Sequence, residues 1–406
     1  MHNNGPKIII AGGKTGGHLF PGIAIAEAIR RQRKFSEILF VGTGEKFEVT
    51  TLERYGFPHT KISCTGIKGK SIKEKLKSVL HIPVSIVQAI KIIKNFNPDI
   101  VIGVGGYSSG PVVLGARLCG VMTAIHEQNS IPGLTNRILS RFVHVIFISF
   151  ENTKGFSKTK LSFYFGNPVR RPVNHGLKNE NITGNRIRIG IGTCAESKNE
   201  NTINNKLESG TETMAGKTET GESKGRLTIL VTGGSQGASS INRAFLDAVK
   251  LMKHPEYYNI IHQTGRDDEE SVIMEYEKMG VKAKVGAFFY NMPFFQDIAD
   301  LIVCRAGAGT LSEISAKGKP SILIPYPHAA NDHQQYNAEF FAEKGAAWVM
   351  KDSEITGHGI KEKIEFAENN PENLASMACA AKSLSMPCAD DNIALKCIQM
   401  AEKKGF

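Results

Sequence analysis

Two glycine-rich turns, each directly after a short apolar run, constrain the fold of this chain more than any other feature. The first turn, residues 12–18 (GGKTGGH), follows the apolar residues 7–11, and the second, residues 233–238 (GGSQGA), follows residues 227–232. A helical pattern follows each turn. A buried strand, a glycine turn and a helix place backbone N–H groups where they can bind an anion. We therefore predict two doubly wound parallel-sheet α/β domains that share an interdomain cleft.

Strand-like runs alternate with helical patterns through both halves, which indicates βαβ units and parallel sheets. In such sheets ligands bind at the carboxyl ends of the strands. The predicted strands are residues 7–11, 38–42, 99–104, 123–126 and 143–149 in the first half, and 227–232, 259–263, 284–287, 301–304 and 321–325 in the second. The predicted helices include residues 19–33, 47–55, 78–95 and 238–251.

The 406 residues exceed what one hydrophobic core usually supports, so two domains are expected. We place a first domain at 1–170, a linker at 171–225 and a second domain at 226–385, and we expect a helix within 386–406 to pack back on the first domain. Within the linker, residues 195–225 are polar and nearly free of aliphatic side chains. Such a segment buries too little apolar area to offset its ordering entropy. We interpret it as a disordered surface insertion, with a functional segment as the alternative.

The chain carries a net charge of +11. Lysines cluster from Lys68 to Lys77, before an apolar run that ends at Val87. No aromatic residues alternate with these lysines, so base stacking is not indicated and we expect no nucleic-acid partner. A basic segment followed by an apolar one is typical of a region that binds an anionic membrane surface. The alternative is an ordinary half-buried helix beside a solvated lysine turn.

The chain shows no pattern for secretion, membrane spanning or metal binding. Residues 1–4 lead directly into the first predicted strand, so no signal peptide is expected. No apolar run reaches the roughly 18 residues of a spanning helix. The seven cysteines show no paired spacing, and His328 and His333 make only a weak metal pattern. We therefore expect a cytosolic protein that uses no metal and no cofactor.

Two residues are candidate catalytic bases. His18 follows the first glycine turn, where an imidazole beside an anion site can accept a proton from an attacking hydroxyl group. A helix cap or a simple phosphate contact is its alternative role. Glu127 belongs to residues 126–129 (HEQN), which end an apolar strand and include Asn129, a candidate for holding a sugar or acceptor hydroxyl group. Because buried polar groups without partners are costly, we expect this run to face the cleft. A hydrogen-bonded network at a domain hinge is the other interpretation.

Further polar residues suggest a nucleotide-sugar site. The small-residue turn 305–310 (RAGAGT) should open a helix at Thr310, whose N-terminal N–H groups favour a diphosphate. Glu313 is either a capping-box residue or an acceptor for two ribose hydroxyl groups. Gln334 and Gln335 can both donate and accept, as sugar hydroxyls require. Arg170 either clamps a phosphate or is a plain surface arginine.

Seven motifs occur in the order typical of the MurG family of N-acetylglucosaminyltransferases, and the chain closely resembles that family outside the insertion. They are GGKTGGHLFPG, GVGGYSSGP, HEQN, GNPVR, GGSQGA, CRAGAGTLSE and HQQYNA. The resemblance implies the GT-B architecture of two Rossmann-like domains. It also implies an inverting, metal-independent transfer of GlcNAc from UDP-GlcNAc to the MurNAc 4-hydroxyl of undecaprenyl-diphospho-MurNAc-pentapeptide, which converts lipid I to lipid II in peptidoglycan synthesis. Another GT-B glycolipid glycosyltransferase or a UDP-GlcNAc epimerase is the alternative.

The resemblance also implies roles for individual residues. The second domain binds UDP-GlcNAc, with a backbone group of Phe289 reading the uracil. The enzyme sits peripherally on the cytoplasmic face of the plasma (inner) membrane through the Lys68–Val87 region. The implied donor-site residues are Thr15, Gly16, Gly17, Asn129, Arg170, Ser235, Phe289, Ala308, Gly309, Thr310, Leu311, Ser312, Glu313, Gln334 and Gln335. The implied residues for the acceptor diphosphate are Gly16, Gly17, Gly105, Gly106 and Tyr107.

Two features depart from the family pattern. Lys14 stands where many members have a glycine or another small residue, and the polar insertion is longer than usual. Neither lies on the donor motifs, so the implied activity is unaffected.

Overall fold

The computed structural model describes residues 5–13, 15–64, 81–151, 153, 155–156, 161–170 and 227–402. Structural statements below concern these residues. Lys14, the basic segment up to residue 80 and the insertion at 195–225 lie outside them, so the predictions made for those parts stay predictions.

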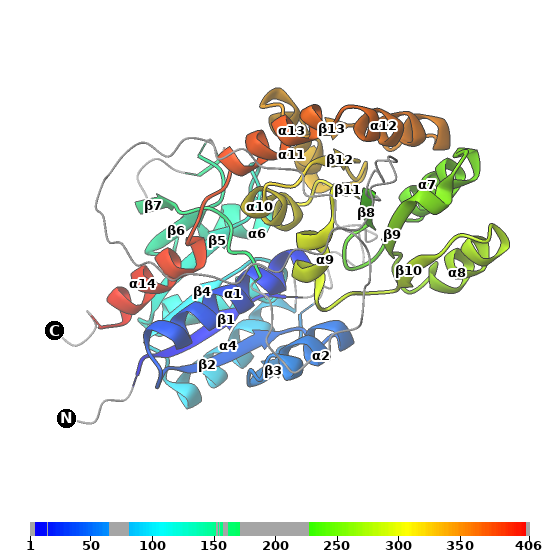
Figure 1. Ribbon diagram of the computed structural model, residues 1–406. Helices are drawn as coiled ribbons and strands as arrows, with labels where there is room; N and C mark the ends of the chain where they lie inside the picture. The colour runs from blue at the N-terminus through cyan, green and yellow to red at the C-terminus, as the bar shows by residue number, and fades with distance from the viewer. Residues whose placement is uncertain are drawn as a thin grey trace, which may run out of the picture.

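Two parallel β-sheets form the centres of two α/β domains (Figure 1). The first sheet has seven strands in the order β3-β2-β1-β4-β5-β6-β7, and the second has six in the order β10-β9-β8-β11-β12-β13. Neighbouring strands in both sheets pair in parallel, for example β1 with β2 and β8 with β9. The predicted fold class is confirmed.

The first domain contains β1 (Lys7–Ala11), α1 (Gly16–Gln32), β2 (Glu37–Gly42), α2 (Lys46–Arg54), β3 (His59–Lys61), α4 (Ile82–Phe96), β4 (Ile100–Gly103), α5 (Ser109–Leu118), β5 (Met122–Glu127), α6 (Leu134–Leu139), β6 (Val145–Ile148) and β7 (Leu161–Tyr164). The second contains β8 (Leu227–Thr232), α7 (Ser239–Leu251), β9 (Tyr258–Gln263), α8 (Glu269–Lys278), β10 (Ala283–Gly286), α9 (Met292–Ile298), β11 (Leu301–Cys304), α10 (Ala308–Lys317), β12 (Ser321–Leu323), α11 (His333–Glu343), β13 (Trp348–Val349), α12 (Gly357–Asn369) and α13 (Pro371–Ser383). The last helix is α14 (Ala389–Glu402).

Strand β1 is buried on both faces because helices cover each side of the sheet. Ile8 and Ile10 pack in the cluster that contains α1 and α14, whereas Ile9 and Ala11 pack in the cluster that contains α4 and α5. Burying each isoleucine stabilises the fold by roughly 1.5–3 kcal/mol. A strand buried on both faces has a continuous apolar sequence, which is why the central strands were predictable.

Helix α14 returns to the first domain after the chain has completed the second. It lies along α1 (Figure 1), and Ile393 and Cys397 join the apolar core of the first domain. Arg31 of α1 forms ion pairs with Asp390 at 2.7 Å and with Asp391 at 2.9 Å. The chain therefore connects the two domains twice.

The two connections touch at Gly166. A Cβ atom built on this residue would lie 2.3 Å from the Cβ of Met386, and its φ of +87° is one that side chains other than glycine rarely adopt. Gly166 therefore leaves room for the Met386 side chain against the backbone of the first connection.

Aromatic side chains also join the domains. Phe288 of the second domain stacks on Phe20 with ring centroids 6.4 Å apart, and it meets Phe47 edge-on at 5.5 Å. The guanidinium of Arg54 lies 4.1 Å from the centre of the Tyr290 ring. These contacts hold the segment after β10 against α1 and α2.

Candidate functional site

The glycine turns of the two domains meet at the domain junction. A Cβ atom on Gly16 would lie 3.5 Å from the Cβ of Ser235, so the first turn faces the second. The first turn also packs on the turn after β4, since a Cβ on Gly12 would lie 2.3 Å from the carbonyl oxygen of Gly105. Three of the predicted phosphate turns thus converge on one place.

His18 lies in the first turn of α1 and is half-buried. Its Nδ1 atom is 3.2 Å from Oε1 of Gln128, and the ring packs against Gly105, where a Cβ would lie 2.6 Å from Nδ1. Burial lowers the pKa of His18, and this effect exceeds that of the hydrogen bond to Gln128, which raises the pKa. The N-cap of α1 is Thr15, so His18 is not the helix cap. A neutral imidazole in this position can accept a proton.

The HEQN segment does not face a cleft as predicted. His126, Glu127 and Gln128 are 0–2% exposed, and only Asn129 of the four is partly exposed. The prediction failed because groups within the first domain satisfy these side chains: nearby residues bond Glu127, whereas the distant Gly166 and Val104 bond His126 and Gln128. The segment is therefore a buried hydrogen-bonded network, which was the alternative interpretation.

Glu127 accepts hydrogen bonds at both carboxylate oxygens. Oε1 accepts from the backbone N–H of Asn129 at 3.0 Å and from its Nδ2 at 3.2 Å. Oε2 accepts from the N–H of Gly133 at 3.2 Å and from Nδ2 of Asn136 at 2.9 Å. Burial raises the pKa of Glu127, and these bonds oppose that shift. The carboxylate holds the loop between β5 and α6.

A second contact of this loop crosses to the other domain. Ser130 Oγ donates to Oδ1 of Asn337 at 3.0 Å, and Asn337 Nδ2 donates to the carbonyl of Ala306 at 3.3 Å. The loop after Glu127 is thereby tied to α11 and to the turn after β11.

Arg170 and Glu313 form a buried ion pair between the domains. Arg170 Nε donates to Oε1 of Glu313 at 2.7 Å and Nη2 donates to Oε2 at 3.1 Å. Gln296 Nε2 also donates to Oε2, at 2.7 Å, and the guanidinium lies 4.2 Å from the centre of the Phe20 ring. Arg170 is therefore not a plain surface arginine.

Helix α10 begins at Ala308, two residues before the predicted start at Thr310, and its N-cap is Gly307. Glu313 thus lies inside the helix with its carboxylate on Arg170 and Gln296, and the capping-box interpretation is wrong. Leu311 is buried in the apolar core, so only its backbone is available to a ligand. The first N–H groups of the helix are positioned for an anion.

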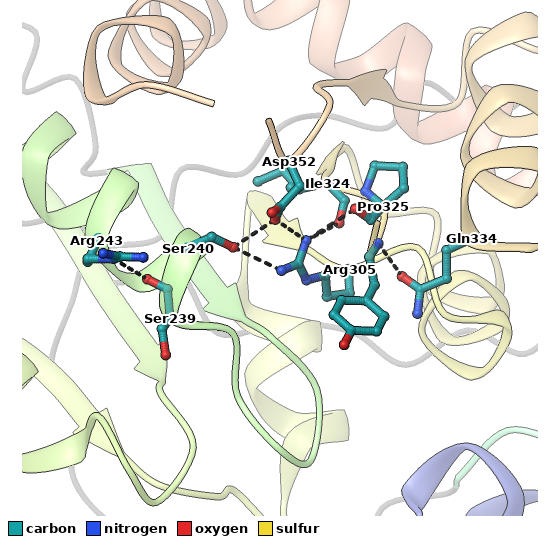
Figure 2. A network of polar contacts seen from close by, with 9 residues as sticks. Ser239, Ser240, Arg243, Arg305, Ile324, Pro325, Gln334 and Asp352 are labelled. Atoms are coloured by element: carbon teal, nitrogen blue, oxygen red, sulfur yellow. Dashed lines mark hydrogen bonds and ion pairs between the residues drawn. The ribbon is translucent and has the colours of Figure 1, made fainter. Parts of the chain in front are cut away.

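Arg305 cross-links three segments around α10 (Figure 2). Its Nη1 donates to the carbonyls of Ile324 and Pro325, each at 3.2 Å, and to Asp352, while Nη2 donates to Ser240 Oγ at 2.9 Å. Ser240 Oγ in turn donates to Asp352 at 2.7 Å. Arg305 therefore holds the start of α7 against the loop that follows β12.

Gln334 and Gln335 both lie at the start of α11 and both use their amides within the protein. The backbone N–H of Tyr326 donates to Oε1 of Gln334 at 2.9 Å. Gln335 Nε2 donates to Glu339 at 2.8 Å. Figure 2 shows the Nε2 group of Gln334 pointing away from its bonded Oε1.

Gln263, at the end of β9, is a site residue that the sequence analysis missed. Its Nε2 donates to the carbonyl of Gly234 at 2.9 Å, and its Oε1 accepts from the backbone N–H of Phe289 at 2.8 Å. The side chain therefore joins the second glycine turn to the Phe289 loop. A polar residue at the carboxyl end of a buried strand was the available signal.

The remaining predicted residues surround the first turn. Gly105 and Gly106 have φ of +95° and +84°, and Tyr107 is 38% exposed. Thr15 and Gly17 are exposed beside them. Within the described ranges no group of three or more His, Cys, Asp or Glu side chains is arranged to hold a metal ion. None of the helices described is long and apolar enough to cross a membrane.

Comparison with known proteins identifies relatives over the full length. The glycosyltransferase family 28 N-terminal domain matches residues 8–148, and the family 28 C-terminal domain matches residues 228–393. The UDP-N-acetylglucosamine–N-acetylmuramyl-(pentapeptide) pyrophosphoryl-undecaprenol N-acetylglucosamine transferase of Syntrophus aciditrophicus is 39% identical over 97% of this chain and 98% of its own length. The protein of the same name from Myxococcus xanthus is 37% identical over 97% of this chain and 93% of its own.

Solved structures show the same architecture. The crystal structure of Acinetobacter baumannii MurG matches with a TM-score of 0.67 and 26% identity, covering 97% of this chain and 99% of that one. A UDP-N-acetylglucosamine 2-epimerase matches with a TM-score of 0.58 and 12% identity over 97% of this chain and 94% of its own. The epimerase likeness concerns the fold alone.

Proposed function

This chain belongs to glycosyltransferase family 28 and, within it, to the MurG family, and we propose which of its residues bind each substrate and which residue is the base. The chain is a UDP-GlcNAc-dependent N-acetylglucosaminyltransferase. It transfers GlcNAc to the lipid-linked MurNAc-pentapeptide acceptor and so converts lipid I to lipid II in peptidoglycan synthesis. The observation that carries this function is 39% identity over 97% of the chain to a transferase of that name.

The donor UDP-GlcNAc binds in the second domain. The turn at Ser235 and the N-terminal N–H groups of α10 bind the diphosphate, because a helix N-terminus favours negative charge. When the donor binds, Glu313 releases Arg170 and accepts hydrogen bonds from the ribose hydroxyls. Arg170 then moves to the diphosphate. Nε2 of Gln334 donates to the sugar. The proposed donor residues are Thr15, Gly16, Gly17, Asn129, Arg170, Ser235, Phe289, Ala308, Gly309, Thr310, Leu311, Ser312, Glu313, Gln334 and Gln335.

The acceptor binds in the first domain. The N–H groups of the turn at Gly16 and Gly17 and of the turn at Gly105 to Tyr107 bind its diphosphate. The support is their close packing at the junction, with Gly16 facing Ser235 of the donor domain. The acceptor hydroxyl then lies beside His18.

His18 is the general base. As the 4-hydroxyl oxygen of MurNAc bonds to the anomeric carbon, the bond from that carbon to UDP breaks, and the hydroxyl proton moves to the imidazole. The charge left on UDP is stabilised by the N-terminus of α10. Glu127 is not the base in this proposal, because four donors already occupy its two oxygens.

Helix α4 belongs to the membrane-binding region. Its exposed apolar side chains include Val84, 49% exposed, and Val87, 66% exposed, and Lys91 and Lys94 are also exposed on this helix. An exposed apolar stripe with lysines suits the surface of an anionic bilayer. In this proposal the enzyme is peripheral and works at the cytoplasmic face, where UDP-GlcNAc is supplied.

The test of the function is the release of UDP from UDP-GlcNAc in EDTA, with and without a lipid I analogue. We expect release only with the acceptor. Release or isomerisation of UDP-GlcNAc without any acceptor would instead support the epimerase alternative, and binding without release would contradict the assignment. Co-sedimentation with vesicles of anionic or neutral lipid tests the membrane proposal separately.

A further inference from the structure

Gln128 lies between two histidines and contacts the Nδ1 atom of each. It is not among the residues expected to contact either substrate. The chain of contacts runs from the carbonyl of Gly166, at the junction of the two domain connections, through His126 and Gln128 to His18.

The first link determines the tautomer of His126. Its Nε2 is 3.3 Å from the carbonyl oxygen of Gly166, which can only accept. Nε2 is also 3.2 Å from Ser149 Oγ, which donates its own hydrogen to the carbonyl of Glu127 at 2.8 Å. Nε2 of His126 therefore carries the hydrogen, and Nδ1 has a free lone pair.

The second link determines the orientation of the Gln128 amide. One end of it is 2.8 Å from the carbonyl oxygen of Val104 and 3.1 Å from Nδ1 of His126. Both of these atoms are acceptors, so this end is the NH₂ group and its two hydrogens are used. The amide oxygen is then the end that faces His18.

The third link determines the tautomer of His18. Oε1 of Gln128 is 3.2 Å from Nδ1 of His18 and can only accept, so Nδ1 carries the hydrogen. Burial lowers the pKa of His18 and lowers that of His126 to about 4, so each ring carries one hydrogen at neutral pH. Of the elements around the His18 ring, β5 contributes the titratable His126 and the turn from Val104 to Gly106 contributes backbone groups.

We propose that Gln128 is a positioning residue that holds His18 as the Nδ1–H tautomer, so that Nε2 presents its lone pair to the acceptor hydroxyl. The inference rests on the proposed role of His18 as the base. A base held in the wrong tautomer loses up to about 10⁴-fold in kcat. His126 and Gln128, two of the three buried polar residues before Asn129, thereby gain a role beyond filling the core.

Two substitutions test the proposal by moving activity in different ways. Gln128→Leu removes the acceptor, and we expect kcat to fall by about 10- to 10⁴-fold with the KM for UDP-GlcNAc within about twofold. Gln128→Glu keeps an acceptor at Nδ1 of His18 and adds a charge that favours the imidazolium. Like the leucine variant, it loses the NH₂ group that donates to Val104 and His126, so the two variants differ at His18. We expect this variant to retain more kcat than the leucine variant and to shift the acid limb of kcat/KM to higher pH. Equal losses in both variants, with an unmoved acid limb, would show that Gln128 only packs.

A measurement on the wild-type protein makes the test independent of how the variants fold. In ¹⁵N-histidine-labelled enzyme, with the His18 signals assigned by their loss in His18→Gln, NMR should place the hydrogen on Nδ1. A hydrogen on Nε2 would overturn the proposal. Gln32→Leu is the matched control for Gln128→Leu, and we expect it to leave kcat unchanged. Gln32 donates to the carbonyl of Asp391 at 2.9 Å and lies far along α1 from the site. If His18→Ala retained full turnover while the Nδ1 hydrogen was observed, the base assignment would fail and the hydrogen-bond chain would stand.

Discussion

Arg170 and Glu313 pair across the domain junction with Nε–Oε1 and Nη2–Oε2 distances of 2.7 and 3.1 Å, and each side chain is only 10% exposed. The carboxylate proposed to bind ribose therefore already has a cation from the first domain as its partner. In the proposed donor complex both members of the pair change partners.

Arg170→Ala leaves the carboxylate of Glu313 buried without its cation. Breaking such a pair by removing one partner costs about 3–5 kcal/mol, so we expect a large fall in the free energy of unfolding, measured in urea. Arg170→Ala with Glu313→Ala should be less destabilised than the sum of the two single variants. Simple additivity would mean that the pair contributes no coupling.

His18→Ala should lower kcat by about 10²- to 10⁴-fold and leave the affinity for UDP-GlcNAc, measured by calorimetry, unchanged. Because burial lowers the pKa of His18, the base is unprotonated at neutral pH. Wild-type activity should therefore fall only as the pH drops below about 6.5, the ordinary histidine value, when the imidazole takes up a proton. A wild-type kcat in the alanine variant would remove His18 from the mechanism.

Glu127→Gln should destabilise the enzyme more than it slows the chemical step. The glutamine has one NH₂ group, which would face donors from Gly133 and Asn136 or from Asn129, so at least one bond becomes a donor–donor contact. We expect a loss of about 1–3 kcal/mol in unfolding experiments. A smaller loss of kcat than in His18→Ala supports the structural role, and a larger loss in a stably folded variant would make Glu127 the base.

Arg305→Lys should raise the KM for UDP-GlcNAc and lower the Tm. A lysine has one nitrogen, which cannot bond Ser240, Asp352 and the two carbonyls of the β12 loop in the geometry of the guanidinium. Arg243→Lys is the control, since Arg243 is exposed and bonds only the carbonyl of Ser239 in Figure 2. Equal effects from both substitutions would refute the cross-linking role of Arg305.

The central strands and their glycine turns were predictable because parallel strands buried on both faces have continuous apolar sequences. All ten predicted strands are present, with ends shifted by at most two residues. The ten predicted strands do not include the two-residue β13 at an edge of the second sheet, nor β3 and β7, which lie at the edges of the first sheet. Both are short and rich in exposed or polar side chains, so no apolar run marks them.

The partners within the site could not be predicted in the same way. Arg170 and Glu313 were each recognised as site residues, but nothing local shows that they bind one another. The burial of the HEQN segment depends on Gly166 and Ser149 from elsewhere in the first domain. Gln263 and Gln296 were missed because an amide acquires its role only from the groups the fold brings to it.

The contact between Gly166 and Met386 has a mechanical consequence. At Gly166 the end of the first domain meets the segment by which the chain returns from the second domain. Anchoring α14 on α1 fixes the second connection to the first domain. A side chain at position 166 would put its Cβ 2.3 Å from that of Met386, so one of the two segments would have to shift. The alignment of a sugar on one domain with a hydroxyl on the other therefore depends on a residue that touches neither.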